Sequence, residues 1–327
     1  MKNVAWIVSG KKLELTSSYR YNAVIPAREL SSRILRFDPD DDTDQFLSSN
    51  QMDAIIICKA LHKQPGSTES HNFIELATKS QKKGIKVCFH ICDWHFENPV
   101  YKTLAEISDL VVVQTKFIAM AVEKHFGKTP AVIEEPYEGP RGKILFKPRK
   151  TLKLVWFGHS QNLDTLAEGI RQLSNLNHLF KLTIVTNDVD LGIKCFDSVP
   201  KPDYLIERKV ISFSLEAQWR EIESSDIVLI PSINTKEKQV KGHNRLVQSI
   251  HSGRLAIAFP LPQYEELGEY CLCYEDMAEG ISWALQNRKT VFQRLKAGQK
   301  YIDQRFAPSV VAMRWKEELT RMLHESR

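Results

Sequence analysis

The stretch LKLVWFGHSQNLDTL (152–166) decides the fold of this chain. Its first part, 153–157, is an almost unbroken apolar run, and apolar residues at helical spacing begin again at Leu163. Gly158 lies between the two parts. A strand buried on both faces and followed at once by a helix is the start of a βαβ unit. Repeated units of this kind form a parallel sheet covered by helices.

The same alternation extends in both directions along the chain. Strands are predicted at 4–8, 54–58, 86–91, 110–113, 181–186, 226–230 and 255–259. Helices are predicted at 27–35, 72–82, 102–107, 117–125, 163–176, 216–224 and 245–251. The tail from 277 to 327 is helical by periodicity, and Gly84, Gly127, Gly298 and Pro308 are expected to interrupt or end helices.

A change of composition separates the two halves. Residues 134–150 hold three prolines, two glycines and no sustained periodicity, as an interdomain linker does. A length of 327 residues also suits two domains. We therefore predict an α/β protein with two Rossmann-like domains facing a cleft, at 1–140 and 151–307, and a C-terminal helix at 308–327 that packs back against the first domain.

Composition limits the classes of function and partner. No apolar run approaches the ~20 residues of a membrane span, and the start MKNVAWIVSGKK meets lysines where a cleavage site should be. The six cysteines lack metal-ligand spacing, so a cytoplasmic protein is expected. No block of like charges indicates nucleic-acid binding. Residues 1–150 carry 22 Lys and Arg against 18 Asp and Glu, an excess that suits weak peripheral association with an anionic membrane, or simply a solvated surface.

The turn after the strand 153–157 is the first candidate site. Gly158 allows backbone N–H groups and a helix N-terminus to approach an anion closely, and His159 and Asn162 add polar side chains at the same place. The alternative is a glycine that serves only turn geometry.

The second candidate is KGHNRLVQSIHSG (241–253), which follows the predicted strand 226–230. Lys241, Asn244 or Arg245, and Gln248 recur at helical spacing and would form one polar stripe. Open α/β sheets bind ligands at the carboxyl ends of their strands, so a diphosphate there would meet a lysine and an arginine fork. The alternative is a solvated helix face.

The third candidate is FHICDWHFENP (89–99), an apolar strand that ends in a polar turn. Asp93 or His95 there would orient or deprotonate an acceptor hydroxyl. His90, Asp93 and His95 have loosely metal-like spacing, but no further ligand is near in the sequence, so structural hydrogen bonds are the better explanation and no metal is predicted. The acidic run DPDDDTD (38–44) contains an Asp-x-Asp pattern but lacks the glycine and glutamate of a calcium loop, so it is interpreted as a solvated turn.

Three segments of the second half resemble the GT-B glycosyltransferases, in particular glycosyltransferase group 1 (family 4) proteins: LKLVWFGHSQNL (152–163), EAQWREIESSDIVLIPS (216–232) and NRLVQSIHSGRLAIAFPLPQYEEL (244–267). In the first half the resemblance is limited to SSYRYNAVIPARELS (17–31) and to CDWHF (92–96) before ISDLVVVQT (107–115). It implies two facing Rossmann-like domains, with the donor nucleotide held mainly by the second.

The resemblance also implies a set of donor-binding residues: Gly10, Gly158, His159, Asn162, Lys241, Asn244, Arg245, Gln248, Tyr264 and Glu265. Within it, Lys241 and Arg245 would bind the diphosphate, Gln248 would lie near the ribose, and Tyr264 with Glu265 would close the pocket. Retaining members of the family carry two glutamates separated by seven residues, and here those places hold Val240 or Lys241 and Gln248. The stereochemical outcome therefore stays open.

Together these features predict a cytoplasmic, metal-independent glycosyltransferase of polysaccharide biosynthesis, which needs no cofactor. It would transfer a sugar from a nucleotide-sugar donor to a glycan or lipid-linked acceptor, with positive charge stabilising the departing diphosphate. Two alternatives remain: a sugar-nucleotide epimerase or phosphorylase on the same fold, and a catalytically silent ligand-binding protein.

Overall fold

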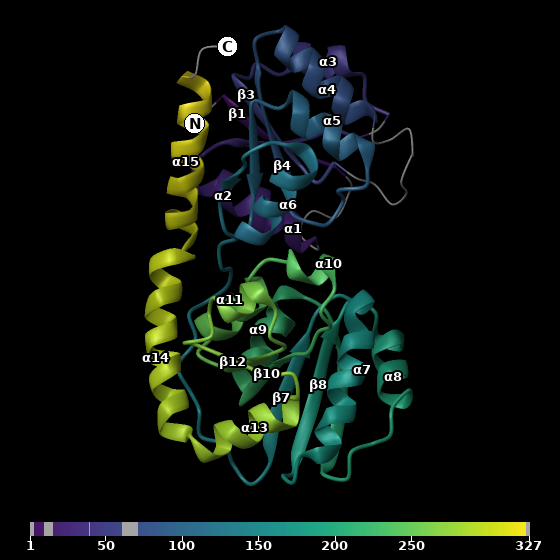
Figure 1. Cartoon of the computed structure of the whole chain (residues 1–327), viewed down its shortest axis with the longest axis vertical. Coiled ribbons are helices and arrows are strands. Elements are labelled where there is room, and N and C mark those ends of the chain that lie inside the picture. The colour runs from purple at the N-terminus through teal and green to yellow at the C-terminus, as the bar shows by residue number, and fades with distance from the viewer. Residues whose placement is uncertain (1–2, 10–15, 39, 61–70, 325–327) are drawn as a thin grey trace. The chain divides into compact units, whose positions relative to one another are not determined.

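The computed structural model describes residues 3–9, 16–38, 40–60 and 71–324, and it divides the chain into two α/β units (Figure 1). Unit 1 comprises Met1–Pro136, Val240–Gly242 and Phe306–Arg327. Unit 2 comprises Tyr137–Gln239 and His243–Arg305. Residues 240–242 thus belong to unit 1, although the chain on both sides of them belongs to unit 2.

The described part of unit 1 contains a six-stranded sheet in the order β2-β1-β3-β4-β5-β6, in which every neighbouring pair is parallel. The strands are β1 (Val4–Val8), β2 (Arg33–Arg36), β3 (Ala54–Cys58), β4 (Lys86–Ile91), β5 (Leu110–Val113) and β6 (Ala131–Val132). Its helical segments are α1 (Ser17–Tyr19), the π-helix η2 (Arg20–Val24), α2 (Ile25–Glu29), α3 (Thr43–Ser49), α4 (His71–Lys82), α5 (Pro99–Ile107), α6 (Lys116–Phe126) and α15 (Pro308–His324).

Both faces of the unit 1 sheet are covered, because successive side chains of a strand point to opposite faces. Ala5 and Ile7 of β1 pack into a cluster with residues of α3 to α6, whereas Val4, Trp6 and Val8 pack into another with residues of α2 and α15. In the second cluster the rings of Trp6 and Trp315 meet edge to face, with centroids 4.8 Å apart. The predicted return of the C-terminal helix is therefore confirmed, since α15 completes the core of unit 1.

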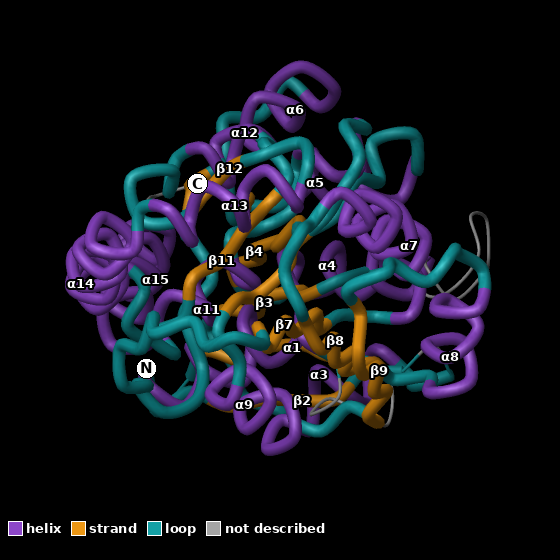
Figure 2. Tube along the Cα trace, turned by 90° about the horizontal axis from the view of Figure 1, so that it is seen from below, coloured by secondary structure: helices purple, strands orange, loops and turns teal. Residues whose placement is uncertain are grey.

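Unit 2, all of whose residues are described, has a six-stranded parallel sheet in the order β12-β11-β10-β7-β8-β9. Its strands are β7 (Leu152–Phe157), β8 (Phe180–Thr186), β9 (Leu205–Ser212), β10 (Ile227–Ile230), β11 (Leu255–Ala258) and β12 (Leu272–Cys273). Its α-helices are α7 (Leu163–Gln172), α8 (Val189–Asp197), α9 (Leu215–Ser224), α10 (Lys236–Gln239), α11 (Asn244–His251), α12 (Pro262–Glu265), α13 (Met277–Gln286) and α14 (Arg288–Arg305). Figure 2 shows α8 beside β9, at one edge of this sheet, and α7 contacts α8.

Local sequence signals set several helix ends. Asp42, Asn98 and Thr115 each accept a hydrogen bond from a first-turn N–H group of α3, α5 and α6, respectively. Gly127 ends α6 in the left-handed conformation, with φ of 65°, as the sequence predicts. Asp42 also explains the acidic run: it is a helix cap, and Asp41 accepts from the Asp38 N–H at 2.7 Å.

Two predictions of secondary structure are wrong. The predicted helix 27–35 is short, because α2 ends at Glu29, Ser31 adopts a positive φ of 50°, and Arg33–Arg36 forms the edge strand β2. Gly298 does not break a helix but lies inside α14, where an added Cβ would lie 2.9 Å from Ile250 and Tyr270. Several other elements have no counterpart in the predicted set, among them α3, β6, α8, β9 and β12.

Among the described helices, none combines the length and the apolar character needed to cross a bilayer.

Candidate active site

The strand order of unit 2 reverses between β7 and β10, which are neighbours in the sheet. Ligands of open α/β sheets bind outside the carboxyl ends of the strands at such a reversal. Gly158 and His159 follow β7, and Pro231 and Ser232 follow β10. An added Cβ at Gly158 would lie 2.9 Å from the Trp156 ring, so glycine allows the turn to lie close to that side chain.

Arg245, in the first turn of α11, reaches this carboxyl edge. Its guanidinium lies over the Trp156 ring at 5.2 Å and over Phe157 at 5.5 Å, and Nη2 donates to the Leu229 carbonyl at 3.5 Å. Burial lowers the pKa of Arg245, and the nearby Tyr264 opposes that effect. Its Nε is buried without a hydrogen-bond acceptor among the described residues. A guanidinium held on an aromatic face with an open donor is suited to bind an anion.

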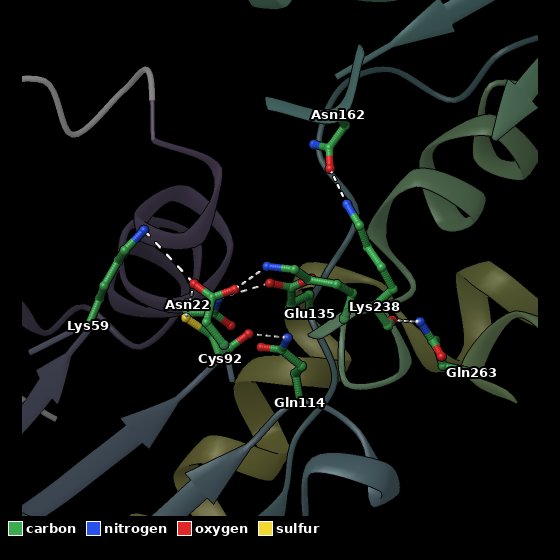
Figure 3. A network of polar contacts seen from close by, with 10 residues as sticks. Asn22, Lys59, Cys92, Gln114, Glu135, Asn162, Lys238 and Gln263 are labelled. Carbon is green, nitrogen blue, oxygen red and sulfur yellow. Dashed lines mark hydrogen bonds and ion pairs between the residues drawn. The ribbon is translucent and has the colours of Figure 1, made fainter. Parts of the chain in front are cut away.

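A second cation of unit 2, Lys238 in α10, donates to Asn162 Oδ1 (Figure 3). The Lys238 carbonyl accepts a hydrogen bond from Gln263 Nε2 at 2.8 Å, and Gln263 is fully buried. Asn162 is therefore at the carboxyl edge as predicted, but its partner, Lys238, lies outside the three candidate motifs.

The turn that carries His159 is held by its own hydrogen bonds. His159 Nδ1 accepts from the Gln161 N–H at 3.2 Å, and Asn187 Oδ1 accepts from the Ser160 N–H at 2.8 Å. Asn187 follows β8, so two neighbouring strand ends fix this turn together.

The predicted polar stripe of Lys241, Arg245 and Gln248 does not form. Helix α11 begins only at Asn244, and Lys241 belongs to unit 1. Gln248 is 1% exposed, and its amide pairs with the main chain of Glu138, donating to the carbonyl at 2.7 Å and accepting from the N–H at 2.8 Å. Gln248 thus anchors the loop after β6, and its amide is occupied there.

The other donor-binding candidates are distributed unevenly. Tyr264 is buried in α12, Glu265 is exposed, and Asn244 is half-buried at the start of α11. Gly10 lies outside the described residues.

A separate set of charged residues gathers at the carboxyl edge of the unit 1 sheet. Lys59 follows β3 and Asp93 follows β4. Lys241 Nζ donates to Asp93 Oδ1, and Lys59 Nζ lies 4.0 Å from Asp93 Oδ2. Figure 3 labels Lys59. Lys59 has a positive φ of 56°, which is a strained conformation for a residue other than glycine.

The two lysines set the charge state of Asp93. Burial raises the pKa of Asp93, but the charge and hydrogen bond of Lys241, with the charge of Lys59, outweigh burial and leave that pKa below its usual range. Burial lowers the pKa of Lys241, and Asp93 more than compensates, so that pKa is raised. Both groups are therefore ionised at neutral pH.

His95, two residues after Asp93, is half-buried and packs edge to face on Tyr101 with ring centroids 4.9 Å apart. Burial lowers the pKa of His95, and the charges of Lys241 and Lys59 add to this effect against the opposing charge of Asp93. A neutral imidazole at neutral pH is able to accept a proton, whereas the depressed pKa of Asp93 makes that carboxylate a weak base.

Three buried polar residues support this edge from behind, and Figure 3 labels them. Asn22, in the π-helix η2, donates to Glu135 Oε1 at 3.0 Å, and Gln114, directly after β5, donates to the Cys92 carbonyl at 2.8 Å. Gly242 lies against Glu135, whose Oε2 an added Cβ would overlap.

Four residues of these two sheet edges are not among the predicted site residues: Lys59, Gln114, Glu135 and Lys238. A usable signal existed for two of them, since Gln114 directly follows the apolar run 110–113 and Glu135 closely follows 131–133. Glu135 lies in the proline- and glycine-rich segment 134–150, which is interpreted as a linker. No group of three or more potential metal ligands occurs within the part of the chain that the structure describes.

Several solved structures are similar to this chain at low sequence identity. HepE from Anabaena, in complex with UDP and glucose, aligns with a TM-score of 0.74 at 12% identity over 98% of this chain and 100% of that one. A glycosyltransferase from Rickettsia africae aligns with a TM-score of 0.72 at 10% identity over 99% of each chain. An alpha-glucosyltransferase in complex with UDP-glucose and DNA aligns with a TM-score of 0.62 at 10% identity over 98% of this chain and 99% of that one.

These similarities show that the chain has the GT-B fold, with a Rossmann-like sheet in each unit. No family model matches the sequence, and no curated protein is recognisably similar to it.

Proposed function

We propose that the protein is a glycosyltransferase that moves a sugar from a nucleotide-sugar donor to a hydroxyl of a glycan or lipid-linked acceptor. Solved structures with the same fold bind UDP or UDP-glucose, which supports a nucleotide-sugar donor. The observation that carries the proposal is the position of Arg245. Its guanidinium lies over the Trp156 ring at the strand reversal of unit 2, and its buried Nε has no hydrogen-bond acceptor among the described residues.

Unit 2 would bind the donor. In this proposal the Arg245 guanidinium and the Lys238 ammonium stabilise the negative charge that develops on the leaving nucleoside diphosphate. Such fixed cations do the work that a bound metal ion does elsewhere, so we propose a metal-independent reaction. Gly158, which has no side chain, would let the donor phosphates approach the main chain of this turn closely.

Unit 1 would bind the acceptor. The acceptor oxygen attacks the anomeric carbon, the bond from that carbon to the diphosphate oxygen breaks, and the nucleoside diphosphate leaves with the bonding electrons. The proton of the acceptor hydroxyl would pass to His95, which is neutral at neutral pH. Asp93, ionised between two lysines, would hold the acceptor hydroxyl by accepting a hydrogen bond.

A direct test begins with binding. Purified protein is titrated with UDP, GDP and ADP, and then with their sugars, while its thermal unfolding is followed. A ligand at a hundred times its dissociation constant stabilises by about 2.7 kcal/mol, which is a readily measured shift. Turnover is then measured as nucleoside diphosphate released with a panel of glycan and lipid-linked acceptors.

The products separate the candidate chemistries. A glycosylated acceptor supports the proposal. An isomerised donor or a sugar phosphate would replace it with an epimerase or a phosphorylase, and binding without turnover on any acceptor would indicate a silent ligand-binding protein.

We also propose a place for the reaction in polysaccharide biosynthesis in the cytoplasm. Weak association with an anionic membrane is part of this proposal, supported only by the excess of lysine and arginine over residues 1–150. Cosedimentation with vesicles that contain or lack anionic lipid tests it.

A further inference from the structure

We propose that Gly242 and Glu135 are positioning residues that fix the ammonium group of Lys241 beside Asp93 at the carboxyl edge of unit 1. The inference rests on the proposed function and deepens it, because it assigns Lys241 to the acceptor side of the reaction rather than to the donor diphosphate. It also explains why a short segment, Val240–Gly242, leaves unit 2 to join unit 1.

All three residues of the segment are anchored in unit 1. Val240 is 2% exposed and packs in the core cluster that contains Phe89 and Ile91 of β4. Lys241 donates to Asp93, which follows the same strand. Gly242 is buried against Glu135. Three consecutive contacts of different kinds hold the segment in one register.

Glycine is required at 242 for space rather than for backbone conformation. Gly242 is not among the glycines with positive φ, so an alanine would meet no backbone strain there. An added Cβ would instead overlap Glu135 Oε2 and lie 3.6 Å from Gln114 Cγ. Glycine is therefore needed at 242 because the main chain there lies against the Glu135 carboxylate.

The carboxylate that receives Gly242 is itself held in place. Glu135 is 6% exposed, and its Oε1 accepts from Asn22 Nδ2 at 3.0 Å. Asn22 is 3% exposed and lies in the π-helix η2, an irregularity that proteins often place at functional sites. Moving Glu135 to admit a methyl group at 242 would disturb this buried hydrogen bond.

The opposite side of Asp93 is also constrained, because Lys59 approaches its other oxygen from a strained backbone. Lys59 and Lys241 thus approach different oxygens of Asp93. A methyl group added at Gly242 would displace the segment that carries Lys241, whereas Lys59 lies on a different segment. Gly242→Ala is consequently a selective probe of the Lys241 position.

The experiment compares Gly242→Ala, Gly242→Ala with Glu135→Asp, Lys241→Met, and Lys241→Met with Gly242→Ala. We expect Gly242→Ala to lower kcat by about ten- to a hundredfold, since misplacement by about 1 Å costs that much, and to leave KM for the donor nearly unchanged. Glu135→Asp draws the carboxylate back from the added methyl group and should restore kcat in part, because it also stretches the hydrogen bond from Asn22. In the Lys241→Met background Gly242→Ala should have no further effect.

A second measurement does not depend on turnover. Acetylation of Lys241 by an activated ester, followed by mass spectrometry, should be faster in Gly242→Ala than in the wild type, and Glu135→Asp should reverse the change. Gly127→Ala is the matched control, because Gly127 is in the same unit with φ of 65° and no atom within 4 Å of an added Cβ. It should lower the melting temperature without changing Lys241 labelling or kcat.

Two results would overturn the inference. One is a folded Gly242→Ala variant with wild-type labelling of Lys241. The other is an equal loss of kcat from Gly242→Ala with and without Lys241. If the wild type transfers no sugar at all, the proposed function fails, and the labelling result alone then decides whether Gly242 and Glu135 position Lys241.

Discussion

Trp6 and Trp315 pack edge to face with ring centroids 4.8 Å apart and ring planes at 72°. Trp6 lies on the second strand in sheet order, and Trp315 lies on the last helix of the chain. Both side chains are almost completely buried, so this pair joins the two ends of the described sequence in one core.

Replacing Trp315 by alanine should lower the free energy of unfolding of unit 1 by about 3–5 kcal/mol, because a large buried ring is lost and a cavity remains. Unfolding in denaturant, followed by tryptophan fluorescence, measures the change. Met313→Ala on the same helix is the control, since Met313 is 56% exposed and should change stability by less than about 0.5 kcal/mol. Equal effects of the two substitutions would contradict the packing.

Stability should decrease in acid through His90. This side chain is 1% exposed, neither ring nitrogen has a hydrogen-bond partner among the described residues, and burial lowers its pKa from 6.5 to about 4 against a small opposing effect of Asp93. Between those two values the unfolded chain binds the proton and the folded chain does not. The free energy of unfolding therefore falls as pH falls through that window, by up to roughly 3 kcal/mol.

Denaturation of wild type and His90→Leu at several pH values from 8 to 4 tests this. The difference in stability between the two proteins should shift in favour of the variant as pH falls below about 6.5. A difference that is constant with pH would show that His90 does not titrate as described.

Removing the guanidinium of Arg245 should weaken transfer. We expect Arg245→Ala to lower kcat/KM by the equivalent of about 2–4 kcal/mol, as loss of a preorganised donor to a developing charge does. Arg245→Lys should also lose activity, because a lysine does not reproduce the planar fork over Trp156. Arg171→Ala, which removes an exposed arginine paired with Glu168, should leave transfer unchanged.

The acid limb of the pH profile should report His95. A base must be neutral to accept a proton, and the pKa of His95 is lowered by burial, so activity should fall only as pH falls below about 6.5. His95→Gln should reduce kcat by about a hundredfold or more and remove that limb. His178→Gln, at a half-buried histidine of unit 2 outside the candidate site, should keep the wild-type profile. An unchanged limb in His95→Gln would assign the proton transfer to another group.

Continuous apolar runs made the interior strands predictable, because β1, β3, β4 and β5 are buried on both faces and read as unbroken hydrophobic segments. Edge strands do not produce that signal. In β9 only Leu205 is buried, and its centre is Glu207, Arg208 and Lys209. Strand β2 alternates between half-buried and exposed residues, and its apolar residues also fit a helix.

The candidate site was predictable only in parts. Polar residues after strand ends indicated Asp93, His95 and Asn162, since parallel strands share one carboxyl edge. The pairing of Lys241 with Asp93 requires that residues 240–242 pack in unit 1. The helical periodicity of residues 244–251 does not indicate that packing. The burial of Gln248 likewise follows from the loop at Glu138, a segment with no regular structure.

The location of α15 in unit 1 has a consequence for biosynthesis. A ribosome makes the sheet of the first unit early and the helix that covers Trp6 only after the whole of unit 2 has been translated. Until then one apolar face of the nascent sheet lacks its covering helix, and exposed surface of that kind favours aggregation. Folding of the first unit is therefore completed last. A chaperone that shields this face would act after the sheet of unit 1 is synthesised and before α15 is.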